Sequence, residues 1–176
     1  MKLSTELTRE AGDDLVNLES GLFWPLQGFM SSHDYHNVVE HMLLSDGSVW
    51  TIPITLDVDH DTFLKAADTG RLHFIFEGRE IGYMDVEDCY RTGKNDLRLI
   101  FGTEDPSHPG VRQEMARRNY RIGGKVKLAD RNLLAQSFDP KATRALFKGK
   151  GWKTVAGFQT RNPIHRAHEY IQKCAL

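Results

Sequence analysis

Short runs of β-forming residues dominate the stretch between residues 49 and 102, and they constrain the fold more than any other feature. Each run is rich in aliphatic and aromatic residues and is closed by Gly, Asp or Asn. Runs of this length and spacing are typical of a small β-barrel or sandwich. They are 49–58 (VWTIPITLDV), 72–78 (LHFIFEG), 79–90 (REIGYMDVEDCY) and 96–102 (DLRLIFG).

Three short helices are predicted around these runs, because three segments follow residues that cap or open helices well. A helix also ends readily where Gly follows it. The segments are 33–44 after Ser31 or Ser32, 62–68 after Asp61 and before Gly70, and 111–119 after Pro109 and Gly110.

The pattern changes after Phe138, Asp139 and Pro140. Residues 141–152 (KATRALFKGKGW) indicate a short basic helix and a connection containing glycine. A strand over Thr154–Phe158, a loop over Gln159–Asn162 and a helix over Pro163–Leu176 are then expected to form the first βα step of a parallel sheet.

A domain boundary is predicted between about Asp139 and Gly151, which divides the chain into domains 1–145 and 146–176. A βαβ unit needs roughly 30 or more residues, and only 25 run from Trp152 to Leu176. The second strand that would complete a βαβ unit therefore has no counterpart in this sequence. We hypothesise that the chain is part of a longer protein.

Composition excludes several classes of protein. Lys and Arg number 23 against 24 Asp and Glu, so no global charge attracts nucleic acid or anionic membranes. The first twenty residues lack the apolar core of a signal peptide, and no run approaches the ~20 apolar residues of a membrane span. A cytoplasmic location is expected. Cys89 and Cys174 are too few for a disulfide framework and are expected to be buried.

The segment GFQTRNPIHRAHE (157–169) combines features of an anion site. Asn162 is a good N-cap and Pro163 suits the first helical position, so unpaired N–H groups would face the end of the preceding strand. On that helix the two histidines share one face with Gln172. The apolar residues share another: Ile164, Ala167, Ile171 and Cys174.

Side chains of the loop add donors suited to phosphate or sulfate oxygens. Arg161 brings a permanent planar charge, Gln159 an amide and Thr160 a hydroxyl. His165 and His168 could instead bind a metal, but the pair lacks the Glu of H-E-x-x-H and a third ligand. No protein-held metal is predicted. A simpler interpretation is that the two histidines only cap a solvated helix.

QTRNPIHRAHE resembles the Q-x-R-N-P-x-H-x-x-H signature of the ATP sulfurylase (sulfate adenylyltransferase) family. Upstream segments are similar to other family segments in the same order, so the resemblance covers nearly the whole chain. These segments are GLFWPLQGFMS, TIPITLDV, DPSHPGV and RIGGKV.

The resemblance implies an α+β architecture: a PUA-like, β-rich barrel domain with short helices, followed by the start of a Rossmann-like nucleotidyltransferase domain. The implied reaction transfers AMP from MgATP to sulfate and gives adenosine 5′-phosphosulfate and pyrophosphate. Mg²⁺ travels with ATP, and a homo-oligomer is implied for the parent enzyme. The isolated chain is expected to be inactive, because a later glycine-containing segment of the family has no counterpart in it.

The resemblance also assigns roles to residues. Gln159 and Arg161 would bind sulfate, while Thr160, Arg161 and Asn162 would line the reacting centre. ATP phosphates would be contacted by all of Gln159–Asn162. His165 and His168 would stabilise the charge that develops on the α-phosphate and on the leaving pyrophosphate.

Nucleic-acid binding and a non-catalytic assembly role remain as alternatives. A basic segment interleaved with tyrosine could bind RNA, as some PUA-like folds do. It comprises Arg117, Arg118, Tyr120, Arg121, Lys125 and Lys127. Acidic neighbours favour a solvated face or a domain interface instead; they are Glu104, Asp105, Glu114 and Asp130. For an assembly piece, the sheet edge near 154–158 would be the contact.

Two other clusters resemble metal sites only superficially. His33, His36 and His41 lie near Asp34 and Glu40 but are expected to decorate a surface helix. The run from Asp57 to Asp61 mimics the start of a calcium loop, yet Thr62 stands where that loop needs Gly and Asp68 where it needs Glu. A strand end followed by a helix cap explains the run.

Overall fold

The structure is a computed structural model that describes residues 2–93, 95–129 and 140–175. It divides into two units, Met1–Pro140 and Lys141–Leu176. The first unit holds the sheet and most of the helices, and the second holds the histidine loop, residues 159–168.

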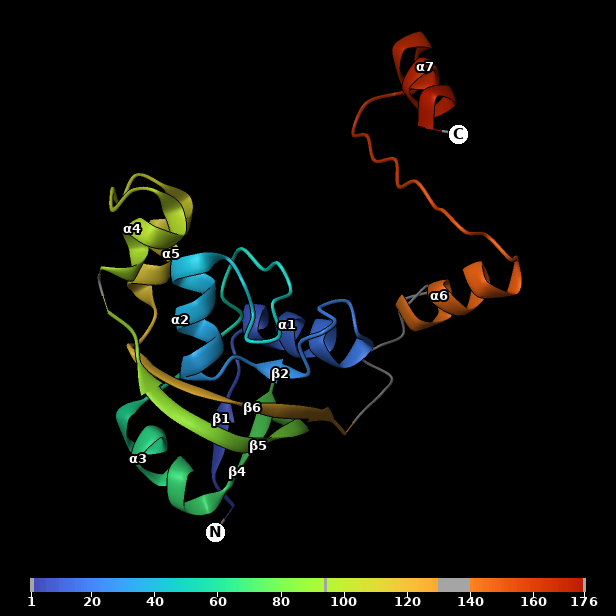
Figure 1. Cartoon of the computed structure of the whole chain (residues 1–176). Helices are drawn as coiled ribbons and strands as arrows, with labels where there is room; N and C mark the ends of the chain where they lie inside the picture. Colours follow the sequence, from blue (N-terminus) through green and yellow to red (C-terminus); the bar gives the residue numbers. More distant parts are fainter. Residues whose placement is uncertain (1, 94, 130–139, 176) are drawn as a thin grey trace. The chain divides into compact units, whose positions relative to one another are not determined.

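A six-stranded sheet organises the first unit (Figure 1). Its strand order is β1-β4-β5-β6-β2, and β3 pairs with β6 beside β2. Only β1 and β4 run parallel; the other pairs are antiparallel. The strands are β1 (Ser4–Glu6), β2 (Gly28–Phe29), β3 (Leu56–Val58), β4 (Arg71–Phe76), β5 (Arg79–Arg91) and β6 (Tyr120–Leu128).

The β-rich domain decorated with short helices is confirmed, with one difference in its sheet. Among the described residues the strand path is open, because β1 and β2 lie at its opposite ends and do not pair. A tight turn joins β4 to β5 at Glu77 and Gly78, both with positive φ. Long pairing of β5 with β6 then forms the centre of the sheet.

Helices cover both faces of the sheet. Figure 1 shows α3 on one face and α1 and α2 on the other. Thr8, Ser31, Asp59 and His108 cap α1, α2, α3 and α5 with a side-chain acceptor. The helices are α1 (Arg9–Ser20), α2 (Ser32–His41), α3 (His60–Thr69), α4 (Asp96–Phe101) and α5 (Pro109–Ala116).

The three expected helices are present as α2, α3 and α5, but the cap of α3 lies two residues earlier than expected. Asp59, not Asp61, accepts the hydrogen bonds from Thr62 N–H and Thr62 Oγ1, both at 2.8 Å. Because Asp59 follows the end of β3, the acidic run is indeed a strand end and a helix cap.

The strand predicted over 96–102 was wrong, since these residues form helix α4. Its apolar residues recur with a helical spacing: Leu97 is buried, and Ile100 packs against the cluster of Tyr35, Val39 and Tyr90. Tyr35 Oη donates to Asp96 Oδ2 at 2.8 Å, and Gly102 ends the helix in the left-handed conformation. Tertiary packing overrides the β propensity of so short a run.

Other boundaries also differ from expectation. In the run 49–58 only Leu56–Val58 forms a strand, while Val49 makes an isolated bridge to Leu43. Helix α1 and strands β1, β2 and β6 were not predicted. For α1 the signals were present, because Thr8 provides a cap and Leu15 and Leu18 recur at helical spacing.

The core of the first unit lies between α1 and the sheet. Leu15 and Leu18 of α1 pack with sheet residues of which Phe74, Met84 and Ile122 are fully buried. Cys89 is half-buried against this core, whereas Cys174 is exposed, so the expectation that both cysteines are buried fails for Cys174.

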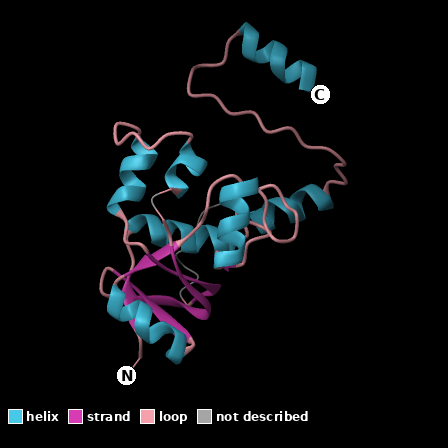
Figure 2. Cartoon of the chain, turned by 60° about the vertical axis from the view of Figure 1, so that its left-hand side comes forward, coloured by secondary structure: helices cyan, strands magenta, loops and turns pink. Residues whose placement is uncertain are grey.

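The second unit contains two helices, α6 (Pro140–Gly149) and α7 (Arg166–Ala175), joined by an extended connection (Figure 2). The basic helix expected within 141–152 is confirmed. The strand expected over Thr154–Phe158 is not formed, because no partner strand is available to it in the described residues. No side chain of either helix is buried.

No helix in the described ranges combines the length and the apolarity that a bilayer crossing requires.

Glycines allow β2 and β6 to approach closely at one end of the sheet. Gly28 of β2 pairs with Lys125, and Phe29 pairs with Gly124. A Cβ at Gly28 would overlap the Gly124 carbonyl, and one at Gly123 would overlap the Met30 carbonyl. The segments PLQGFM and RIGGKV are therefore tied together by backbone contacts that only Gly permits.

Gly28→Ala should lower the free energy of unfolding by at least ~2 kcal/mol, because the added methyl group displaces a backbone carbonyl. Gly12→Ala in α1 is the matched control: its Cβ would lie 3.6 Å from the Phe76 ring, an ordinary contact. That variant should be neutral or gain up to about 1 kcal/mol. Urea unfolding measures both, and equal stabilities would contradict this account of β2.

Candidate active site

The loop before α7 is held by its own polar groups. Thr160 Oγ1 accepts a hydrogen bond from Asn162 N–H at 3.1 Å and donates one to Asn162 O at 3.2 Å. This short turn leaves the side chains of Gln159, Arg161 and Asn162 exposed. Thr160 itself is half-buried, and its hydroxyl organises the loop.

The helix that follows begins three residues later than expected. It starts at Arg166 rather than Pro163, so Asn162 does not cap it. The histidines do: His168 Nδ1 accepts from His165 N–H at 3.4 Å, and His165 Nδ1 accepts from Ala167 N–H at 3.3 Å. Two of the helix's unpaired N–H donors are satisfied in this way.

The two imidazole rings lie against each other, with centroids 4.0 Å apart and planes 37° apart. His165 is exposed and His168 half-buried. The expectation that both point the same way from the start of the helix is met, although His165 stands just before the helix rather than within it.

These groups favour a ligand with several negatively charged oxygens. Arg161 provides a guanidinium, Gln159 and Asn162 provide amides, and the histidines provide ring nitrogens, all within one stretch of ten residues. No group of three or more His, Cys, Asp and Glu side chains that could hold a metal ion occurs in the described part of the chain.

Family comparisons divide the sequence in two. The family model for the PUA-like domain matches residues 2–131, and that for ATP-sulfurylase matches residues 135–176, which include the histidine loop. The chain belongs to the ATP sulfurylase family.

Curated relatives confirm this membership. Sulfate adenylyltransferases of Halothermothrix orenii and Chloroflexus aurantiacus are 42% and 43% identical to this chain over 97% of its length. That of Hyperthermus butylicus is 40% identical over 97%. The chain spans 46%, 45% and 45% of these three proteins respectively, which is less than half of each.

A solved structure with a similar fold is the hexameric APS kinase from Thiobacillus denitrificans. The TM-score is 0.63 at 26% identity, and the match covers 99% of this chain and 32% of that one.

In this family member the basic segment is neutralised by its own unit. Arg117 Nε donates to Asp57 Oδ1 at 3.0 Å and its Nη1 to Glu114 Oε2 at 3.1 Å. Arg121 is only 1% exposed and bonds to Glu114 Oε1 at 2.5 Å. Arg118 contacts Asp57 at 3.5 Å. The expected solvated face is therefore wrong for Arg121, and the arginines join α5 and β3 to β6 instead.

The remaining candidates are structural or lie on the surface. His36 Nδ1 lies 2.6 Å from Ser32 O within α2, and His41 lies 3.7 Å from Glu40. His33 is exposed on the same helix, as expected. Lys125 contacts Glu87 at 3.8 Å. Asp130, one of the acidic residues flanking the basic segment, lies outside the described residues.

Asp14 is a strongly perturbed carboxyl among the described residues of the first unit. It lines a cavity of about 420 Å³ between α1, β3 and α5, together with Glu10, Asp57 and Arg117. Burial raises the pKa of Asp14 to about 6, and Glu10 adds to this rise while Arg117 opposes it. By contrast, Arg117 holds the pKa of Asp57 below its usual range although burial alone would raise it.

Asp14→Asn should raise the free energy of unfolding at pH 7 by about 1 kcal/mol. Solvent screening of a partly exposed carboxyl keeps this below the ~3 kcal/mol that such a shift implies for a fully buried group. Because the folded-state pKa is raised, the destabilisation by Asp14 grows as the pH rises from about 4 through about 6. The gain should therefore shrink toward pH 4.

Chemical denaturation at pH 4, 5, 6 and 7 tests this dependence. Asp68→Asn, which changes an exposed carboxyl on α3, is the control and should leave the pH profile unchanged. A constant difference between Asp14→Asn and the parent chain at all four pH values would show that the carboxyl is not perturbed.

Proposed function

We propose that the chain is the N-terminal portion of a sulfate adenylyltransferase. In this proposal residues 1–145 are the PUA-like domain and residues 146–176 begin the nucleotidyltransferase domain. The observation that carries it is the loop Gln159–His168, in which a guanidinium, two amides and two adjacent imidazoles occur in the segment that matches the ATP-sulfurylase model.

The proposed reaction is direct transfer of AMP from MgATP to sulfate. A sulfate oxygen attacks the α-phosphorus in line, the bond from that phosphorus to the bridging oxygen breaks, and pyrophosphate leaves. Sulfate is already ionised and needs no general base. Catalysis therefore depends on positioning the reactants and on stabilising charge in the transition state.

Each loop residue has a role in this proposal. Gln159 and Arg161 bind sulfate; Thr160, Arg161 and Asn162 line the reacting centre, Thr160 through the turn that it closes with Asn162. The ATP phosphates contact Gln159–Asn162. His165 and His168 donate to the α-phosphate and to the leaving pyrophosphate.

Mg²⁺ enters with ATP as part of the substrate, because the donors of the loop are nitrogen groups that suit oxyanions rather than a hard cation. The oligomeric state proposed for the enzyme is a homo-oligomer, in line with the hexameric APS kinase whose fold is similar. We place the enzyme in the cytoplasm, where ATP is available. The proposal includes sulfate assimilation as the pathway of the forward reaction.

The test is sulfate-dependent release of pyrophosphate from MgATP. It should be measured for this chain and for a chimera in which the chain replaces the matching 45% of the Chloroflexus aurantiacus enzyme. The chimera should release pyrophosphate only when sulfate is present. A folded chimera that binds MgATP but shows no such release would refute the proposed function.

His168→Ala in the chimera should lower kcat by roughly 10² or more, the scale of losing one preorganised donor to the transition state. Lys173→Gln is the control on the same helix, because Lys173 is exposed and pairs only with Glu169 among the described residues. Its kcat should stay within twofold of the parent. Steady-state kinetics give both values, and an unchanged kcat in His168→Ala would exclude the role of His168.

A further inference from the structure

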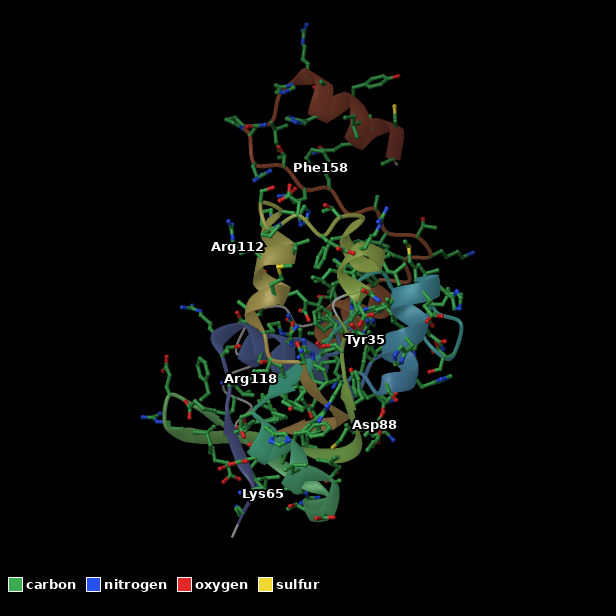
Figure 3. The ribbon with its side chains drawn as sticks, turned by 90° about the vertical axis from the view of Figure 1, so that its left-hand side faces the viewer. Tyr35, Lys65, Asp88, Arg112, Arg118 and Phe158 are labelled. Carbon is green, nitrogen blue, oxygen red and sulfur yellow. The ribbon has the colours of Figure 1, made fainter. Side chains whose placement is uncertain are left out.

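Phe158 lies on the extended segment that leads to α7 (Figure 3) and makes a contact that core packing does not explain. Its ring is 40% exposed, and no residue of either helix in the second unit is buried. The ring contacts His168: the ring centroids are 5.7 Å apart and the planes meet at 69°. The phenyl group thus meets the imidazole edge to face.

His168 contacts two other rings. Its ring centroid lies 5.7 Å from that of Phe158 and 4.0 Å from that of His165. A histidine ring without neighbours rotates about a broad, roughly two-fold torsion, so Nδ1 easily exchanges places with Cδ2, and Nε2 with Cε1. Contacts with two neighbouring rings restrict this rotation of His168.

The hydrogen bonds of His165 and His168 determine which ring nitrogen carries the proton. His168 Nδ1 accepts from His165 N–H, and His165 Nδ1 accepts from Ala167 N–H. A ring nitrogen that accepts a hydrogen bond has no proton, so in the neutral rings the proton is on Nε2. Both imidazoles therefore direct an Nε2–H donor away from the backbone of α7.

We propose that Phe158 is a positioning residue, which holds the His168 ring, and through it the His165 ring, so that both Nε2–H groups face the phosphate oxygens of the substrate. The consequence for catalysis rests on the proposed adenylyltransfer. The arrangement of the rings does not, and it can be measured without substrate.

The first experiment measures ring nitrogens in the 176-residue chain. With ¹⁵N-labelled histidine at pH 8, His165 and His168 should each show a protonated Nε2 and an unprotonated Nδ1. Phe158→Ala should convert His168 to a mixture of both tautomers, and Phe158→Tyr should keep the parent spectrum. A protonated Nδ1 in the parent chain, or an unchanged His168 in Phe158→Ala, would overturn the proposal.

The second experiment measures kinetics in the Chloroflexus aurantiacus chimera. Phe158→Ala should lower kcat about 5- to 10-fold, because a donor loses its fixed orientation. KM for sulfate and for MgATP should stay within about twofold, since Phe158 touches neither substrate, and Phe158→Tyr should restore kcat. Tyr170→Ala, which removes another exposed aromatic ring from α7, is the control and should match the parent.

The two experiments fail in different ways. If the chimera shows no sulfate-dependent pyrophosphate release, the proposed function is refuted. The arrangement of the rings is then still tested by the ¹⁵N spectra of the histidines. A fall in kcat for Phe158→Ala without any change in the His168 spectrum would show that Phe158 acts through another group, and the proposal would be wrong.

Discussion

Strand β6 is the element on which the first unit depends. It pairs with β5 along its whole length and carries β2 and β3 on its other edge. This arrangement requires Gly28 and Gly123, because a Cβ at Gly28 would overlap the Gly124 carbonyl and one at Gly123 would overlap the Met30 carbonyl. The glycines permit this close approach, and the apolar packing of α1 against the sheet holds the N-terminal third of the chain there.

A network of ion pairs also connects β6 to neighbouring elements. Arg121 of β6 is buried and bonded to Glu114, and Arg117 binds Glu114 and Asp57. A buried charge is tolerated only with partners, and these partners come from α5 and β3. The network therefore orders two elements around β6, and it uses the arginines that would otherwise be available to a nucleic-acid backbone.

Much of this organisation could be predicted from sequence, where local rules agree with the fold. The runs at 72–78 and 79–90 became β4 and β5 because alternating burial and Gly78 specify a hairpin. The run at 96–102 did not become a strand, since it packs against Tyr35, which lies 61 residues before Asp96 in the sequence. Strands of two or three residues, such as β1 and β2, have no periodic signal and exist only through their partners.

For the histidine loop, the residues could be predicted from the sequence but their geometry could not. Its residues could be selected from the sequence because Gln159, Arg161 and the two histidines are residue types that can donate hydrogen bonds to oxyanions, and they occur at a fixed spacing. Its geometry could not, because Asn162 and Pro163 favour a helix start that the structure shifts to Arg166. A ten-residue helix that buries nothing is marginal by itself. Its first turn is ordered by His165 and His168, whose Nδ1 atoms satisfy the N–H groups there. The same rings that cap the helix are the donors of the candidate site, so forming the helix end and orienting the donors are one event.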